Sequence, residues 1–117
     1  MFQDDQALLL DMHIAAEQAR SHVEGIDWAA FDGSALIQDA VIRQVQIIGE
    51  AASRVSPVFQ KAHPEISWHR IVGMRHRLVH DYRTIRRDVL WDAVQNWIPE
   101  LLESLARLVP AEPPEEE

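Results

Sequence analysis

The chain has 117 residues, no cysteine and a formal net charge of −8 at pH 7. This length is enough for one domain with a modest core, and a hydrophobic fraction of 47% is typical of globular chains. Because the sequence lacks cysteine, disulfides and thiolate metal sites are excluded, and a cytoplasmic location is expected. No apolar run approaches the roughly 20 residues of a membrane-spanning helix, so no membrane association is expected.

The charges are unevenly distributed. Four glutamates fall in a Pro-rich end segment, so we expect one domain over residues 1–109 and a disordered acidic tail over residues 110–117. Six of the eleven basic residues lie close together, namely Arg70, Arg75, Arg77, Arg83, Arg86 and Arg87. This distribution favours a small phosphate-contacting patch and argues against broad affinity for nucleic acid.

The first predicted helix covers about residues 5–24. It ends at Gly25, since glycine readily adopts the backbone conformation that terminates a helix. We expect a loop containing Trp28 and Phe31 to follow.

The second predicted helix begins after Asp32 or Ser34, either of which can cap it, and continues to about Val55. Its apolar residues form two stripes: Ile37, Val41, Val45, Ile48 and Ala52 on one side, and Leu36, Ala40, Ile47 and Ala51 on the other. A helix that is apolar on two sides packs on both, which suggests a second protomer.

A connector with Pro57, Pro64 and one short helical turn leads to the third predicted helix, residues 65–82. At about 100° per residue, one apolar sector contains Trp68, Ile71, Val72, Met74, Leu78 and Val79. Arg75 and Tyr82 project into the middle of this sector. Because burying an unpaired guanidinium is costly, an arginine there must either form an ion pair or have a function such as binding a ligand.

The other polar residues of this helix lie elsewhere on its surface. One flank carries His69, His76 and His80, and the outward face carries Arg70, Arg77 and Asp81. Arg75 and His80 are separated by about 140° on an ideal helix. They can address one phosphate only if the helix end distorts or a second protomer contributes, which favours a dimeric site.

The fourth predicted helix spans about residues 88–108, and Pro99 should kink it. Its inward residues are Leu90, Val94, Trp97, Leu101, Leu105 and Leu108. No stretch shows the alternation of a strand, so the predicted fold is an all-α, four-helix, up-and-down bundle.

Each chemically suggestive residue also has a plainer interpretation. Arg75 could form a structural ion pair with a carboxylate such as Glu50 or Asp39. A single histidine such as His80 is more often a satisfied surface or core residue than a catalyst. Tyr82 could simply pack at a helix end with its hydroxyl in water.

A metal site is a further alternative. His76 and His80 are four residues apart on one helical face, with His69 one heptad before His76, a spacing that suits zinc ligands. The region is rich in arginine, has no cysteine, and lacks the glutamate of a helical His-Glu-x-x-His site. We therefore expect neither a metal nor another cofactor.

Three segments, in matching order and spacing, resemble the HepT-like branch of the HEPN superfamily. They are Trp68–Tyr82, Ile48–Ala52 and Trp91–Leu101. The first contains Arg75, then four residues, His80, one residue and Tyr82. The resemblance covers roughly residues 5–108.

This resemblance implies a homodimeric HEPN bundle in which the third helices of both protomers line one cleft. It implies a metal-independent endoribonuclease that acts as the toxin of a type VII-like toxin–antitoxin system, with RNA as its substrate. The implied antitoxin is a minimal nucleotidyltransferase that transfers AMP from ATP to a tyrosine. By position, the catalytic residues are Arg75 and His80, and the modified residue is Tyr82. The supporting residues would be His76 and Arg77. The contacts to RNA phosphates would be Arg70, Arg83, Arg86 and Arg87.

The expected chemistry is transesterification, because RNA carries its own 2′-hydroxyl nucleophile. His80 would transfer the proton and Arg75 would hold the phosphate, leaving a 2′,3′-cyclic phosphate and a 5′-hydroxyl. A competing prediction is an inactive interaction or nucleotide-binding module that pairs with a nucleotidyltransferase, which the acidic balance favours.

Two positions depart from the family pattern. His76 stands where the family commonly has a polar amide, and could either titrate or preserve a hydrogen bond. Arg86 stands where a helix-capping acid is frequent, so Asp88 or Thr84 must start the last helix.

Overall fold

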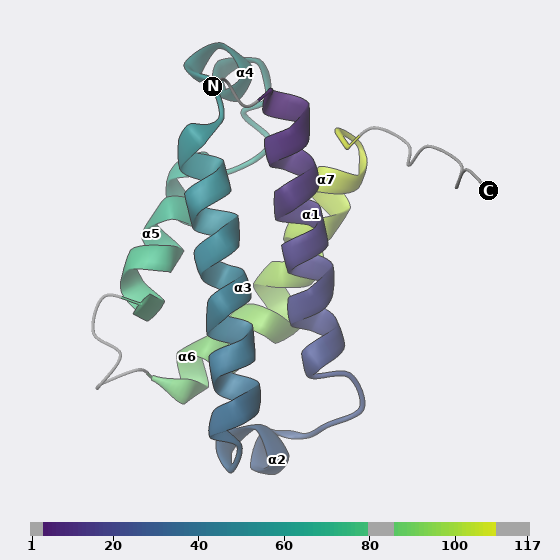
Figure 1. Cartoon of the computed structure of the whole chain (residues 1–117), viewed down its shortest axis with the longest axis vertical. Coiled ribbons are helices and arrows are strands. Elements are labelled where there is room, and N and C mark those ends of the chain that lie inside the picture. The colour runs from purple at the N-terminus through teal and green to yellow at the C-terminus, as the bar shows by residue number, and fades with distance from the viewer. Residues whose placement is uncertain (1–3, 80–85, 110–117) are drawn as a thin grey trace, which may run out of the picture.

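The computed structural model describes residues 4–79 and 86–109 (Figure 1). All regular elements in these ranges are helical, which confirms the predicted all-α fold. They are α1 (Asp5–His22), α2 (Trp28–Asp32), α3 (Ala35–Arg54), α4 (Pro57–Ala62), α5 (Trp68–Val79), α6 (Arg87–Asp92), the π-helical turn η1 (Ala93–Trp97) and α7 (Ile98–Ala106). The predicted acidic tail, residues 110–117, lies outside the described residues, so the division into domain and tail stays a prediction. Within the described ranges, none of the helices is sufficiently long and apolar to span a bilayer.

The two longest helices, α1 and α3, run side by side through the centre of the molecule (Figure 1). Helix α5 packs against α3, whereas η1 and α7 pack against α1. Apolar side chains from all of these elements form one core. The largest fully buried ones are Phe31, Leu8, Leu9, Met12, Ile48, Ile71, Leu90, Ile98 and Leu105.

Side-chain caps fix the beginnings of the first three helices. Asp4 accepts a hydrogen bond from the Gln6 amide at 2.8 Å and starts α1. Helix α1 ends at His22, slightly earlier than predicted, and Gly25 has the positive φ of 75° that its glycine allows. Of the two predicted caps for α3, Ser34 is the one used.

The predicted loop around Trp28 and Phe31 is instead the short helix α2. Asp27 caps it by accepting a hydrogen bond from the Ala30 amide at 2.9 Å. Phe31 is completely buried, and its ring centroid lies 5.0 Å from that of Trp91 in α6. Aromatic packing between α2 and α6 therefore holds a segment that we predicted to be irregular.

The connector between α3 and α5 is tied to the rest of the fold by hydrogen bonds. The Ser56 hydroxyl and amide both donate to the Asp5 carboxylate, at 2.6 and 2.8 Å. Helix α5 begins at Trp68 rather than at the predicted Glu65. Its first side chain donates an indole hydrogen bond to the His63 carbonyl at 3.0 Å, which anchors the start of the helix.

The predicted last helix is divided into α6, η1 and α7, and its predicted inward residues are buried or half-buried. Pro99 lacks an N–H, and its ring conflicts with the carbonyl of an ideal preceding turn. The chain widens into a π-helical turn just before it, where the Ile98 amide donates to the Ala93 carbonyl. The predicted kink thus takes the form of a π turn.

Candidate active site at the end of helix α5

Helix α5 carries the first part of the Arg-x4-His-x-Tyr segment and is held by its apolar side. Trp68, Ile71 and Leu78 are buried, and Val72 and Met74 pack partly against the same core. This face is turned toward α3, the helix with which α5 makes its main contact. The predicted apolar sector is therefore confirmed for these residues.

Arg75 lies directly against Gly49 of α3. A Cβ atom added to Gly49 would lie 2.5 Å from the Arg75 Cβ and 2.6 Å from its Cδ. The two helices approach this closely because residue 49 has no side chain. The aliphatic stem of Arg75 is therefore packed on the α3 backbone.

The charge of Arg75 is not used within the described residues. The side chain is half-buried, and it makes no ion pair or hydrogen bond in the part of the chain that the structure describes. Glu50, one of the two carboxylates considered as its structural partner, lies 3.0 Å from Arg54 instead. Asp39, the other, is exposed and forms no ion pair with Arg75. The arrangement leaves a guanidinium able to bind an anion.

The outward face of α5 borders an open groove of about 650 Å³. His69, Arg70 and Arg77 line it from α5, while Asp88 and Asp92 line it from the opposite side. Arg70 and Arg77 are exposed, as predicted, and share this groove. The structure thus separates them from Arg75, which faces α3.

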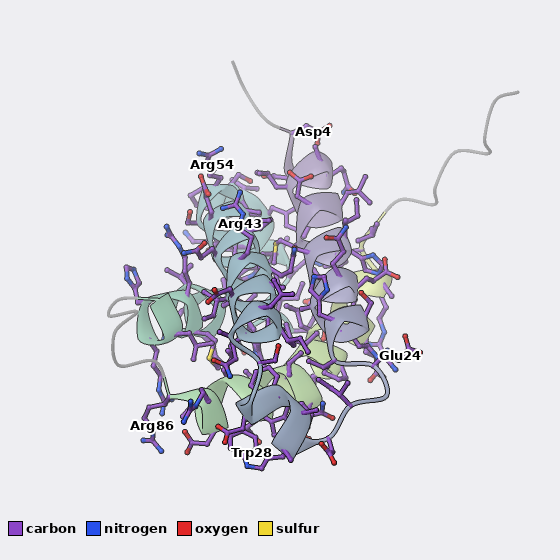
Figure 2. All side chains as sticks on the ribbon, turned by 60° about the horizontal axis from the view of Figure 1, so that its bottom comes forward. Asp4, Glu24, Trp28, Arg43, Arg54 and Arg86 are labelled. Carbon is purple, nitrogen blue, oxygen red and sulfur yellow. The ribbon has the colours of Figure 1, made fainter. Side chains whose placement is uncertain are left out.

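The two described arginines near the start of α6 are engaged in surface ion pairs. Arg86 Nη2 lies 2.7 Å from Asp88 Oδ2, and Arg87 Nε lies 3.0 Å from Asp32 Oδ1 on α2. Figure 2 shows Arg86 at the outer edge of the molecule, away from the packed helices. The hydrogen bond from Arg86 is the main cause that lowers the pKa of the Asp88 carboxyl. Exposed pairs of this kind are weak, so an external anion can displace either carboxylate.

The prediction that Asp88 starts the last helix is wrong, because α6 begins at Arg87. Arg86 occupies the capping position of α6 and makes no side-chain cap hydrogen bond. Asp88 lies in the first turn, where its negative charge is favourable at a helix N-terminus. Thr84, the other predicted starting residue, lies outside the described residues.

In the sequence, residues 80–85 follow helix α5 and precede helix α6. The α5 end is fixed by Leu78 in the core and by Arg75 on α3, whereas the α6 end is fixed by aromatic packing of Trp91 on α2. The predicted catalytic residue His80, the predicted modified residue Tyr82 and the predicted phosphate contact Arg83 fall within this segment, outside the described residues. Their roles stay predictions.

The histidines proposed as alternative zinc ligands are only partly described. His69 and His76 are both exposed on α5, and the third, His80, is outside the described residues. In residues 4–79 and 86–109, no three His, Cys, Asp or Glu side chains form a metal-binding group.

Gly49 belongs to the Ile48–Ala52 segment, but its spacing in the sequence predicts no role for it. A signal was present, because glycine in the middle of a 20-residue helix is unfavourable and calls for a packing reason. The partner across the contact could not be inferred from spacing, since it lies 26 positions later in the chain.

Several known proteins have sequences similar to this chain. The chain is 33% identical over 98 residues to a candidate RNase of Methanocaldococcus jannaschii, covering 84% of this chain and 90% of the relative. It is 30% identical over 90 residues to a candidate RNase of Caldanaerobacter subterraneus, covering 77% and 80%. It is 44% identical over 64 residues to a probable ribonuclease HepT of Thermococcus cleftensis, covering 55% and 58%. No solved structure gives a significant match.

The family comparison extends over most of the chain. The Ribonuclease HepT-like family matches residues 12–108, a range that runs from α1 past the end of α7 and includes Arg75 and Gly49. This agrees with the resemblance inferred from three short segments. The chain belongs to the HepT-like ribonuclease family.

Proposed function

We propose that this protein is a metal-independent endoribonuclease that cleaves RNA by attack of the 2′-hydroxyl on the adjacent phosphodiester. The main support for this proposal is the environment of the Arg75 side chain. Its stem is fixed on α3, and its guanidinium has no carboxylate partner in the described part of the chain. A fixed, unpaired cation on a ribonuclease-family fold is suited to holding a phosphate.

The proposed division of labour follows from side-chain chemistry. Arg75 stabilises the negative charge that grows on the phosphate oxygens in the transition state. His80, with an ordinary pKa of about 6.5, exchanges protons with the attacking or leaving oxygen. His76 and Arg77, in the last described turn of α5, are the proposed supporting residues, and Arg77 would act on the RNA from the outward groove rather than on Arg75. No oxidant, metal or external nucleophile is required, because the 2′-hydroxyl belongs to the substrate.

The groove on the outward face of α5 is proposed as the path of the RNA beyond the cleaved bond. Arg70 lines it, and Arg83, Arg86 and Arg87 are the further proposed phosphate contacts. Asp88 and Asp92 on the opposite wall can accept hydrogen bonds from exocyclic amino groups of bases, while repelling phosphates. Within the groove itself, which Arg86 and Arg87 do not line, the strand would therefore lie with its backbone toward α5.

Cleavage of a synthetic single-stranded RNA in excess EDTA tests the enzymatic proposal. The purified chain should produce 2′,3′-cyclic phosphate and 5′-hydroxyl ends, identified by mass spectrometry. Arg75→Ala and His80→Ala should each lower the rate at least about 10²-fold, the range in which electrostatic and acid–base catalysis contribute. RNA with 2′-O-methyl groups should remain intact.

Matched controls remove the same charges elsewhere. Arg20→Ala deletes an exposed guanidinium from α1, and His22→Ala deletes an imidazole from the last turn of α1. Both variants should cleave at the rate of the parent chain. Full activity in His80→Ala, or activity that disappears only with EDTA, would refute the proposed chemistry.

A homodimer is proposed as the active form. On an ideal helix Arg75 and His80 diverge by about 140°, so two protomers could supply them to one phosphate. Leu36, from the second apolar stripe of α3, is 81% exposed, and Ala40 and Ile47 of the same stripe are half-buried. These residues are the proposed contact between protomers.

Regulation by a partner is the finer part of the proposal. We propose that the chain is the toxin of a type VII-like toxin–antitoxin pair, and that a minimal nucleotidyltransferase inhibits it by transferring AMP to Tyr82. The attached phosphodiester and nucleotide would block RNA and neutralise nearby arginines. Intact-mass measurement with the partner and ATP should show an AMP increment that is lost in Tyr82→Phe. An increment retained in Tyr82→Phe would place the modification elsewhere.

A second candidate function is a binding module without nuclease activity. The net charge of −8 favours it, since an acidic chain has little general attraction for RNA. This function predicts partner binding that persists in Arg75→Ala, together with no cleavage by the parent chain. Induced expression with and without the adjacent partner, followed by scoring of RNA integrity, distinguishes the two.

A further inference from the structure

We infer that Gly49 is a positioning residue for Arg75, and that its missing side chain is a requirement of the active site rather than of helix α3. This inference rests on the proposed function of Arg75 in binding the RNA phosphate. It identifies a residue on a different helix, with no polar group of its own, as a determinant of cleavage.

The contact leaves no room for a methyl group. A Cβ on Gly49 would be 2.5 Å from the Arg75 Cβ, 2.6 Å from its Cδ and 2.9 Å from its Cγ. Carbon atoms in proteins approach to about 3.5–4.0 Å. The conflict includes the Arg75 Cβ, which is attached to the α5 backbone and cannot swing away as a side-chain end could. Helix α5 would have to move by about 1 Å relative to α3.

Gly73 supplies an internal comparison. It also lies in a helix, two positions before Arg75, yet a Cβ added there would meet no atom within 4 Å. By intrinsic helix propensity, alanine is better than glycine at both positions. Gly73→Ala and Gly49→Ala should therefore change stability in opposite directions, because only Gly49 faces an occupied space.

A movement of α5 relative to α3 would affect cleavage because no other contact fixes the position of the Arg75 guanidinium among the described residues. Its guanidinium makes no hydrogen bond or ion pair there, so its position depends on where its stem lies. A misplacement of about 1 Å can lower a rate by about 10²-fold. The consequence of filling the space at residue 49 should therefore be larger for cleavage than for folding.

A stability cycle tests the contact independently of any nuclease activity. Thermal midpoints would be measured for the parent chain, Gly49→Ala, Arg75→Gly and the double variant. Gly49→Ala should lower the midpoint in the parent chain but leave that of Arg75→Gly equal or higher, because Arg75→Gly removes all three opposing atoms. A decrease of similar size in both backgrounds, or a failure of Arg75→Gly to rescue a Gly49→Ala chain that does not fold, would overturn the inference.

Single-turnover RNA cleavage, well below all midpoints, tests the positioning role. Gly49→Ala should reduce the rate by about 10- to 100-fold, with no further loss when it is added to Arg75→Gly. If Gly49 affected cleavage independently of Arg75, the two losses would multiply. Parent-like cleavage by Gly49→Ala, with Arg75→Gly inactive, would overturn the inference and leave the proposed function intact. Parent-like cleavage by Arg75→Gly would instead refute the proposed function.

Discussion

Arg75 is held by its stem rather than by its charge. The side chain is half-buried, with its methylenes over Gly49, while the guanidinium has no carboxylate partner in the described residues. An arginine neutralised by Glu50 would first have to lose that partner before binding a phosphate. The observed arrangement avoids this step.

Arg75→Met separates packing from charge at this position. Methionine keeps an apolar stem of similar width, so the free energy of unfolding should change by less than about 1 kcal/mol. Cleavage should fall about 10²-fold or more, because the phosphate loses its cation. Chemical denaturation and a cleavage assay on the same preparation compare the two effects. A stability loss as large as the loss of transition-state stabilisation would indicate a structural arginine.

The Arg86–Asp88 pair gives a prediction for pH. The pKa of Asp88 is lowered chiefly by the Arg86 hydrogen bond, so in Arg86→Ala it should rise toward the ordinary value of about 3.9. Because the folded pKa is the lower one, this contribution to stability is present above the unfolded pKa and is lost as the pH falls through the folded pKa. An NMR titration of the Asp88 carboxyl carbon checks the direction. An unchanged pKa in the variant contradicts the assigned cause.

The residue patterns of α5 could be predicted because they depend on one helix alone. Spacing placed Arg75 on the apolar side and Arg70 and Arg77 on the outside, and the structure confirms both. The pairing of Arg87 with Asp32 could not be predicted, since it joins two distant parts of the chain. The relation of Arg75 to Gly49 was missed for the same reason.

At the scale of whole elements, the long helices were predicted because apolar periodicity and caps agree. The predictions are wrong where tertiary contacts, rather than local sequence, determine the backbone conformation. Helix α2 has only five residues, too few to be stable alone, and it exists because Phe31 is buried and packs on Trp91. The π turn before Pro99 is a second example. Pro99 cannot donate a backbone hydrogen bond, and the π turn allows Trp97 before the proline and Leu101 after it to be buried in the same core.

Gly73→Ala should stabilise helix α5. The added methyl group meets nothing within 4 Å, and replacing glycine by alanine inside a helix contributes about 0.5–1 kcal/mol. Urea unfolding should therefore show a higher midpoint with an unchanged slope. A lower midpoint would mean that the space beside Gly73 is occupied in solution, for example by a second protomer.

For the whole molecule, an acidic protein that binds RNA should do so through few contacts. If the proposed contacts Arg70, Arg75, Arg83, Arg86 and Arg87 all reach phosphates of one single strand, log K should fall with log[salt] with a slope of about −3 to −4. Binding of uncleavable 2′-O-methyl RNA across a salt series measures this. A slope near zero would exclude a phosphate-based interface.

The proposed dimer makes a separate prediction for the whole molecule. Leu36→Glu places a charge on an 81% exposed position of α3, so it should leave the monomer fold intact. It should reduce the sedimenting mass from two chains to one and lower cleavage in parallel. Val58→Glu, at an 80% exposed position on α4, provides the matched control. A parent chain that sediments as a monomer and cleaves RNA fully would contradict the two-protomer site.

The junction of α2 and α6 also provides an optical signal. The indole rings of Trp28 and Trp91 touch there, with centroids 6.2 Å apart, and Arg87 bridges the same two helices through Asp32. Indole emission is sensitive to its surroundings, so displacement of α6 by a bound strand or nucleotide should alter the intrinsic fluorescence of the unlabelled protein. Ligand binding at α6 could thus be followed in real time without attaching a dye.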